Sequence, residues 1–226
     1  MSISNNINKI LEEIPANVKL VAVSKTKPAE MIQEAWEGGY RIFGENRPQE
    51  LKQKHSDLPQ DIEWHFIGHL QSNKVKYIAP FVSLIHAIDS IKLLEVVNKE
   101  AQKSDRVIDC LLQFHIAEEE TKFGLDLQEA ETMLNSEQFN VLKNIRIVGV
   151  MGMATYTDDE EQVRKEFRNL KGIFGQLKDE FYMTEDSFKE ISMGMSGDYR
   201  LAIEEGSTII RVGSSIFGVR NYSQQG

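Results

Sequence analysis

The chain has 226 residues, 41% of them apolar, and its 26 basic and 35 acidic residues give a formal net charge of −9. Leu, Ile, Val and Phe recur throughout and only five prolines interrupt them, which argues against a disordered chain. An acidic chain without clustered basic residues also argues against nucleic-acid binding.

The single cysteine and the absence of long apolar runs indicate in which cellular compartment the protein works. Cys110 has no partner cysteine, so neither an intrachain disulfide nor a cysteine-rich zinc site can form, which fits a reducing environment. The N-terminus lacks a basic head followed by an apolar run, and nowhere do about 18 apolar residues occur together. We therefore expect a cytoplasmic protein that does not contact membranes.

Helical and strand-like segments alternate along the chain. Apolar residues at helical spacing from Ile3 to Ile14 predict an N-terminal helix, and the apolar run 19–24 then predicts a buried strand. Pro28 next opens a helix that ends at Gly38. Further strands are predicted at 40–43, 62–67, 82–87, 107–114, 145–150, 188–193 and 207–212, with a helical segment between each pair.

The repeated strand–helix order predicts the fold class. The clearest helix runs from Val163 to Phe181, with apolar residues every three or four positions and charges on the other face. Eight such units predict a closed (β/α)₈ barrel with an additional N-terminal helix, and an open doubly wound sheet is the competing architecture. No linker or composition break divides the chain, so we expect residues 1–226 to form one domain.

Lys25 ends the first predicted strand. Barrel enzymes place their chemistry at the C-terminal ends of the strands, and buried lysines are rare unless they are used. If the strand continues, Lys27 shares the face of Lys25, and charge repulsion with desolvation would lower the pKa of either amine and favour Schiff-base chemistry. The alternative is that both lysines bend outward in a loop.

Small residues follow the last two predicted strands. Ser196-Gly197 and the segment 213–215 resemble the paired loops with which many barrels bind phosphate, although Ser196 could instead cap a helix. Arg211 lies two residues before Gly213 and therefore shares its face. This pairing suggests a ligand with both a phosphate and a ring or carboxylate, and the alternative for Arg211 is a structural ion pair.

Histidines near three consecutive strand ends raise the possibility of a metal site. Metal-dependent barrel hydrolases use such histidines together with an aspartate, for which Asp89 is the candidate. The first strand, however, offers a lysine and no His-x-His pair, so metal catalysis is the weaker alternative. The histidines concerned are His65, His69, His86 and His115.

Five segments, in the same order from the first strand to the last, together resemble the pyridoxal phosphate homeostasis protein family. The resemblance implies a barrel like the N-terminal domain of alanine racemase, without that enzyme's second, β-rich domain. It also implies pyridoxal 5′-phosphate (PLP) as the cofactor, held as an aldimine on Lys25, with Arg211 at the pyridine nitrogen. The segments are Val-Ala-Val-Ser-Lys-Thr-Lys-Pro (21–28), Phe-Gly-Glu-Asn (43–46), His-Phe-Ile-Gly-His-Leu-Gln-Ser-Asn-Lys (65–74), Ser-Met-Gly-Met-Ser (192–196) and Arg-Val-Gly-Ser-Ser-Ile-Phe-Gly (211–218).

The same resemblance implies the remaining contacts of the cofactor. Ser196, Gly213 and Ser214 would surround the phosphate, and Asn46 and His65 would border the ring. This assignment agrees with the residue-level argument, because a strand-end amine, an inward arginine and two phosphate-binding loops are what one PLP molecule requires.

The resemblance also bears on catalysis. An arginine does not readily give up a proton, so a pyridine beside it stays unprotonated and is a weak electron sink. Racemisation further needs a second acid or base, which the racemase takes from a domain that this chain lacks. We therefore expect a monomeric PLP carrier for vitamin B6 homeostasis that supplies apo-enzymes without robust turnover. The alternative is an amino-acid racemase with His65 or Tyr199 as the second base.

Overall fold

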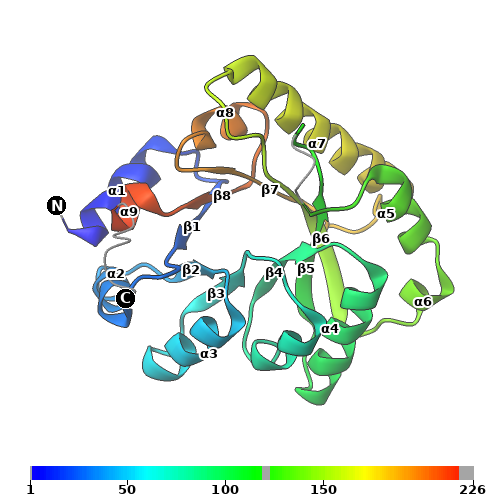
Figure 1. Ribbon diagram of the computed structural model, residues 1–226, viewed down its shortest axis with the longest axis horizontal. Helices are drawn as coiled ribbons and strands as arrows, with labels where there is room; N and C mark the ends of the chain where they lie inside the picture. The colour runs from blue at the N-terminus through cyan, green and yellow to red at the C-terminus, as the bar shows by residue number, and fades with distance from the viewer. Residues whose placement is uncertain (1, 119–122, 219–226) are drawn as a thin grey trace.

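The computed structural model of the protein describes residues 2–118 and 123–218. Eight parallel strands pair in chain order, and the last pairs with the first, so they close into a barrel surrounded by helices (Figure 1). The predicted (β/α)₈ barrel is confirmed, and the open-sheet alternative is wrong. The strands are β1 (Lys19–Val23), β2 (Ile42–Glu45), β3 (Glu63–Phe66), β4 (Leu84–Ile88), β5 (Ile108–Phe114), β6 (Ile145–Gly152), β7 (Glu190–Met195) and β8 (Ile209–Val212).

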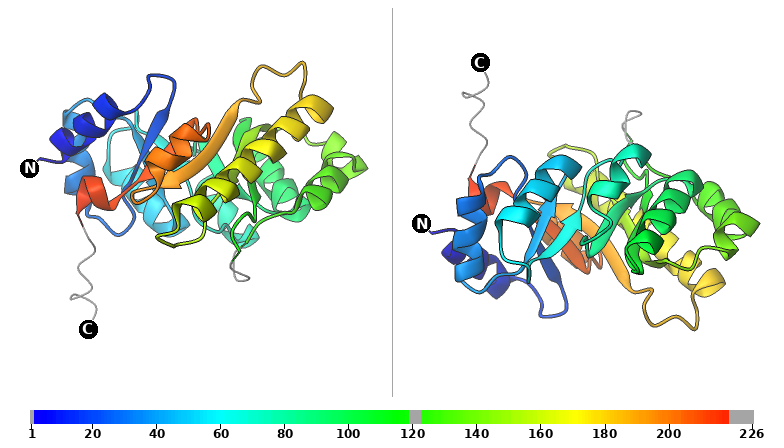
Figure 2. Two further views of the ribbon diagram at one scale, coloured as in Figure 1. Left: turned by 90° about the horizontal axis from the view of Figure 1, so that it is seen from above. Right: turned by 90° about the horizontal axis from the view of Figure 1, so that it is seen from below.

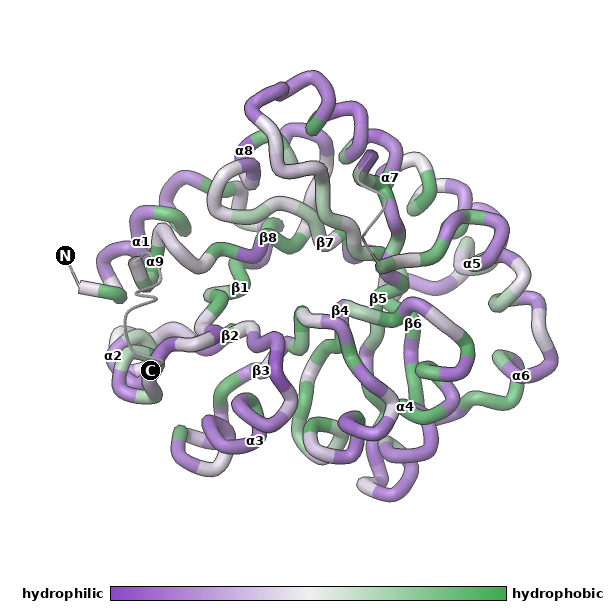
Figure 3. Tube along the Cα trace, in the orientation of Figure 1, coloured by the Kyte–Doolittle hydropathy of each residue, from purple (hydrophilic) through white to green (hydrophobic). Residues whose placement is uncertain are grey.

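Helices cover the strands on opposite sides of the molecule. The left view of Figure 2 shows α1 (Ile3–Glu13), α7 (Glu160–Phe181) and α8 (Tyr199–Glu204) in front of the strands, and the right view shows α2 (Ala29–Glu37), α3 (Pro48–Asp57) and α4 (Ile91–Lys103) in front. Each helix carries both apolar and polar residues (Figure 3), as expected where one face packs on the barrel. The helices are α1 (Ile3–Glu13), α2 (Ala29–Glu37), α3 (Pro48–Asp57), the 3₁₀ helix η1 (Ser72–Tyr77), α4 (Ile91–Lys103), α5 (Leu127–Leu134), α6 (Glu137–Asn140), α7 (Glu160–Phe181), α8 (Tyr199–Glu204) and α9 (Ser214–Phe217).

The connection between β3 and β4 differs from the prediction of a regular helix. Its only helical segment is η1, in which backbone hydrogen bonds close over three residues. Lys74 N donates to Gln71 O at 2.9 Å, and Ile78 N donates to Val75 O at 3.0 Å. The segment therefore covers its part of the barrel with tight turns and not with an α-helix.

The predicted N-terminal helix is confirmed as α1, which completes the outer ring. Within the described residues, the last strand is followed by the four-residue α9, and α1 packs against both α9 and α2 (Figure 1). Ile3, Ile7 and Ile10 are buried on this face, and Asn6 Nδ2 donates to the carbonyl of Ile216 at 2.9 Å. The start of the chain thus supplies the cover that a helix after β8 provides in a regular barrel.

Among the helices of the described segments, none combines the length and the apolar character needed to cross a membrane.

Candidate functional site

Lys25 lies in the turn between β1 and α2 (residues 24–27, the β1–α2 turn) and is partly buried. β1 ends two residues earlier, and Thr26 adopts a left-handed conformation with φ 64°, so the strand does not continue to Lys27. Lys27 Nζ instead donates to the carbonyls of Phe217 and Gly218, at 3.0 Å each. The condition under which Lys27 would share a strand face with Lys25, a continuing strand, is therefore not met.

A buried ion cluster from β2 and α3 holds the β1–α2 turn. Lys54 Nζ pairs with Glu45 and with Glu50, at 2.7 Å each, and donates to the carbonyl of Ser24 at 2.9 Å. Glu50 Oε1 also accepts from Thr26 N at 2.7 Å. Burial raises the pKa of the Glu45 carboxyl, although the neighbouring Lys54 opposes this. The cluster thus fixes the backbone on both sides of Lys25.

Asn46 follows β2 and presents a buried acceptor. Its Oδ1 has no hydrogen-bond partner within the described part of the chain. The end of β3 approaches closely, since a Cβ on Gly68 would stand 2.6 Å from Asn46 O. Buried polar atoms in native proteins nearly always have partners, so this oxygen favours a ligand that donates a hydrogen bond here.

The loops after β7 and β8 meet, as a phosphate site requires. Gly213 N donates to Ser196 Oγ at 3.1 Å, and Ser214 follows as the first residue of α9. The N-cap of α8 is Asp198, whose Oδ1 accepts from Met195 N at 2.5 Å. The interpretation of Ser196 as a helix cap is therefore wrong, and the three predicted phosphate residues lie together.

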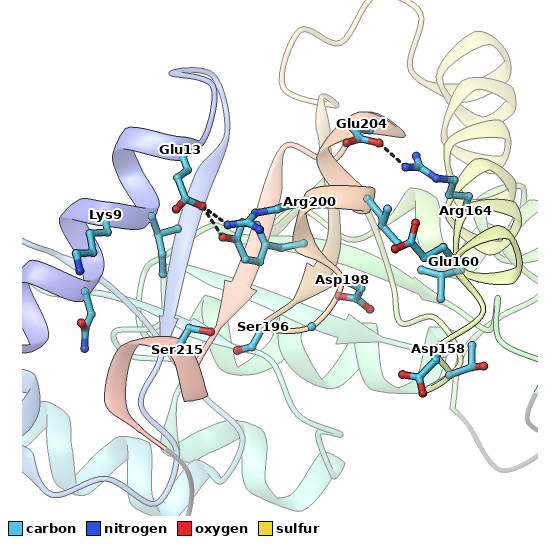
Figure 4. Close-up of a pocket in the computed structure, with 17 residues that line it drawn as sticks. Lys9, Glu13, Asp158, Glu160, Arg164, Ser196, Asp198, Arg200, Glu204 and Ser215 are labelled. Carbon is cyan, nitrogen blue, oxygen red and sulfur yellow. Dashed lines mark hydrogen bonds and ion pairs between the residues drawn. The ribbon is translucent and has the colours of Figure 1, made fainter.

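A cavity of about 760 Å³ borders these loops and extends between α1, α7 and α8 (Figure 4). Ser196 and Ser215 line one side of it. On another side, Tyr199 Oη and Arg200 Nη2 both donate to Glu13 Oε2, at 3.0 and 2.8 Å. The walls are thus polar, and part of their charge is already paired.

Arg211 lies inside the barrel and is 4% exposed. Its Nη1 donates to Ser192 Oγ at 2.6 Å, and its Nη2 donates to the carbonyl of Gly152 at 3.1 Å. Among residues 2–118 and 123–218 no carboxylate lies within ion-pair distance of this side chain, although the Asp198 carboxylate interacts with its charge. Burial lowers the pKa of Arg211 to about 10. The guanidinium keeps donors for a further acceptor, because it carries five N–H groups.

The strand-end histidines do not gather around one point. His65 Nδ1 lies 3.0 Å from His86 Nε2, and His86 Nδ1 lies 2.9 Å from Ser192 Oγ, all within the barrel interior. His69 Nδ1 is instead 3.5 Å from Asp89 Oδ2. In the parts of the chain that the structure places, no three His, Cys, Asp or Glu side chains are arranged to hold a metal ion.

Some residues of the site were not singled out from the sequence. Ser192 is a buried polar residue on a strand, and this signal could have marked it as a partner of Arg211, whereas His86 was singled out only as a candidate metal ligand. Lys54 gave no such signal, because Glu50 and Lys54 read as an ordinary surface pair one helical turn apart.

Comparison with known proteins gives a consistent answer. A family model described as "Alanine racemase, N-terminal domain" matches residues 1–221. A protein of Aquifex aeolicus named "Pyridoxal phosphate homeostasis protein" is 40% identical over 205 residues, which covers 90% of this chain and 88% of the relative. The human protein of that name is 39% identical over 225 residues, covering 94% and 81%. The chain belongs to the pyridoxal phosphate homeostasis protein family.

Solved structures agree with this family. PipY of Synechococcus elongatus without PLP is 34% identical with a TM-score of 0.88, covering 96% of this chain and 100% of its own. PipY with PLP bound is 34% identical with a TM-score of 0.85 and the same coverage. Alanine racemase of Bartonella henselae, at 16% identity and a TM-score of 0.73, shares the fold and covers 96% of this chain but only 58% of its own.

Proposed function

We propose that this protein binds PLP at the C-terminal mouth of its barrel and acts in vitamin B6 homeostasis without robust turnover. One arrangement carries the proposal: the same end of the barrel holds a lysine in the β1–α2 turn, a buried arginine without an ion pair, and two joined loops of small residues. The names of its relatives and the PLP bound in PipY support the same ligand.

In this proposal Lys25 and the two loops hold opposite ends of the cofactor. When bound, PLP supplies an aldehyde that condenses with an amine and releases water, and Lys25 Nζ is the amine assigned to it. Ser196 and Ser214 offer hydroxyl donors to the phosphate, and the backbone at Gly213 allows close approach. The cluster around Lys54 keeps the β1–α2 turn in place for this contact.

Three further residues would contact the ring. Arg211 would donate to the ring nitrogen and, because it does not readily lose a proton, would leave that nitrogen unprotonated. Asn46 Oδ1 would gain the hydrogen bond that it lacks. His65 would border the ring while both of its own nitrogens keep their partners, His86 and Glu63.

Existing hydrogen bonds favour a carrier over a racemase. Both candidates for a second base are already hydrogen-bonded, Tyr199 to Glu13 and His65 to His86 and Glu63. Burial and the hydrogen bond to Glu13 raise the pKa of Tyr199, which makes its phenolate scarce near neutral pH. Neither residue is therefore set up to take a proton from a substrate.

The proposal also includes the cellular location, the oligomeric state and the partners of the protein. Cys110 is a fully buried free thiol, which suits a cytoplasmic protein. We further propose that residues 1–226 work as one monomeric unit and that apo-enzymes requiring PLP are its recipients.

Titration of the apo-protein with PLP tests the binding site. Wild-type protein should gain a violet-range absorption band with one equivalent of PLP, and Lys25→Ala should lose the band while the phosphate loops retain weak binding. Lys76→Ala, which removes an exposed lysine of η1, should behave as wild type. Equal bands for Lys25→Ala and wild type would exclude Lys25 as the attachment point.

Deuterium exchange separates the carrier from the racemase. The PLP-loaded protein is incubated with L-alanine in heavy water, and deuterium at Cα is followed by NMR. We expect exchange no faster than with free PLP. Rapid exchange that Tyr199→Phe or His65→Gln abolishes would contradict the carrier function.

A further inference from the structure

A continuous line of hydrogen bonds crosses the interior of the barrel below the site. It begins at Arg211 on β8 and passes through Ser192 on β7, His86 on β4 and His65 on β3 to Glu63. The four bonds measure 2.6, 2.9, 3.0 and 3.0 Å. All members except Glu63 are buried, and Glu63 is the first residue of β3, at the end of the barrel opposite to the cofactor site.

The donors and acceptors of Arg211 and Ser192 determine the direction of the hydrogen bonds at the arginine end. A guanidinium only donates, so Ser192 Oγ accepts from Arg211 Nη1. Ser192 has a single hydroxyl proton, and donating it to His86 Nδ1 satisfies both atoms. His86 is then a neutral ring with its proton on Nε2. Burial lowers the pKa of His86 well below its usual range, which agrees with a neutral ring.

The same reasoning continues to the carboxylate. His86 Nε2–H donates to His65 Nδ1, so His65 must carry its proton on Nε2 and donate it to Glu63 Oε1. This hydrogen bond is the main reason that the pKa of Glu63 lies below its usual value. Each donor thus has one acceptor, and every hydrogen bond is donated in the direction from Arg211 toward Glu63.

We propose that Ser192, His86, His65 and Glu63 form one ordered chain that positions Arg211. In the chain both histidines are neutral and protonated on Nε2. Ser192 and His86 are thus positioning residues that act on the cofactor ring through Arg211, and this part of the inference rests on the proposed function. Without the chain, the guanidinium keeps its hydrogen bond to the carbonyl of Gly152 but loses the one to Ser192, so its direction toward the ring nitrogen is less well fixed.

Nitrogen NMR of the apo-protein tests the proton order without any cofactor. In ¹⁵N-labelled protein, long-range proton–nitrogen spectra distinguish the two neutral tautomers and the charged ring. We expect His65 and His86 to show pure Nε2–H tautomers. A protonated Nδ1 on either ring in wild-type protein would overturn the chain.

A matched pair of variants at the exposed end tests the carboxylate. Glu63→Gln keeps an oxygen that accepts from His65 Nε2–H, so both tautomers should stay as in wild type. Glu63→Leu removes the acceptor, so the His65 signals should shift toward a mixture of tautomers. The same spectrum for Glu63→Leu as for wild type would show that Glu63 does not order the chain.

PLP binding tests the positioning of Arg211. Ser192→Ala removes a hydrogen bond to a charged group, so the Kd for PLP should rise about tenfold to a hundredfold and the absorption maximum should shift. Ser207→Ala removes a buried hydroxyl that bonds only to backbone carbonyls, and its Kd should stay within about twofold of wild type. Ser192→Thr, which keeps the hydroxyl, should recover most of the affinity.

The outcomes separate the inference from the proposed function. Equal Kd values for Ser192→Ala and Ser207→Ala, with wild-type binding intact, would overturn the positioning role alone. A wild-type protein that does not bind PLP would overturn the proposed function and the positioning role with it, whereas the tautomers would still decide whether the ordered chain exists.

Discussion

Lys54 illustrates how a single buried charge can shape a binding site. The residue is 6% exposed and has three acceptors, the carboxylates of Glu45 and Glu50 and the carbonyl of Ser24. Buried ion pairs add little net stability over well-packed apolar residues, but an unpaired buried charge is strongly destabilising. The main effect of Lys54 is therefore to fix the β1–α2 turn that carries Lys25.

Lys54→Met should lower the free energy of unfolding by about 3 kcal/mol, because it leaves the buried Glu45 carboxylate without its cation. Urea unfolding measures this. Lys52→Met, an exposed change on the same helix, should alter the free energy by less than about 0.5 kcal/mol.

Adding Glu45→Leu to Lys54→Met should recover part of the loss, since the uncompensated carboxylate is then gone. Equal urea midpoints for Lys54→Met and Lys52→Met would show that the cluster does not stabilise the fold.

At the scale of elements, the strands were largely predictable and the contacts between elements were not. Most of the buried strands contain a short apolar run, so their places follow from composition, although β2 runs over Ile42–Glu45 and not 40–43, and β7 begins at Glu190 and not at Phe188. Phe188 instead stacks on Tyr182, with ring centroids 4.2 Å apart. Periodicity gave no warning that η1 would be a 3₁₀ helix.

In the candidate site, too, some features could be predicted from the sequence and others could not. Lys25, Ser196, Gly213 and Ser214 could be chosen from strand ends, because the barrel brings those ends together. The fixed turn around Lys25 could not be foreseen, since it depends on Lys54 reaching across from α3. A side chain's partner on another element depends on packing, which strand and helix patterns do not encode.

On the scale of the whole molecule, the two ends of the barrel differ. The N-terminal end carries ion pairs between strands, Lys19 on β1 with Glu190 on β7 at 2.8 Å and Arg146 on β6 with Asp109 on β5 at 2.7 Å. The C-terminal end carries the residues assigned to PLP. Conventional barrels divide stability and function between their ends in this way. The interior chain from Glu63 to Arg211 connects the two ends here.

The central claim is that PLP attaches to Lys25 at the mouth of this barrel. Reducing the PLP-loaded protein with borohydride makes the attachment permanent, and peptide mapping by mass spectrometry then locates it. We predict one modified peptide, containing Lys25, at close to one equivalent per chain. Label spread over exposed lysines such as Lys76, or no label at all, would contradict it.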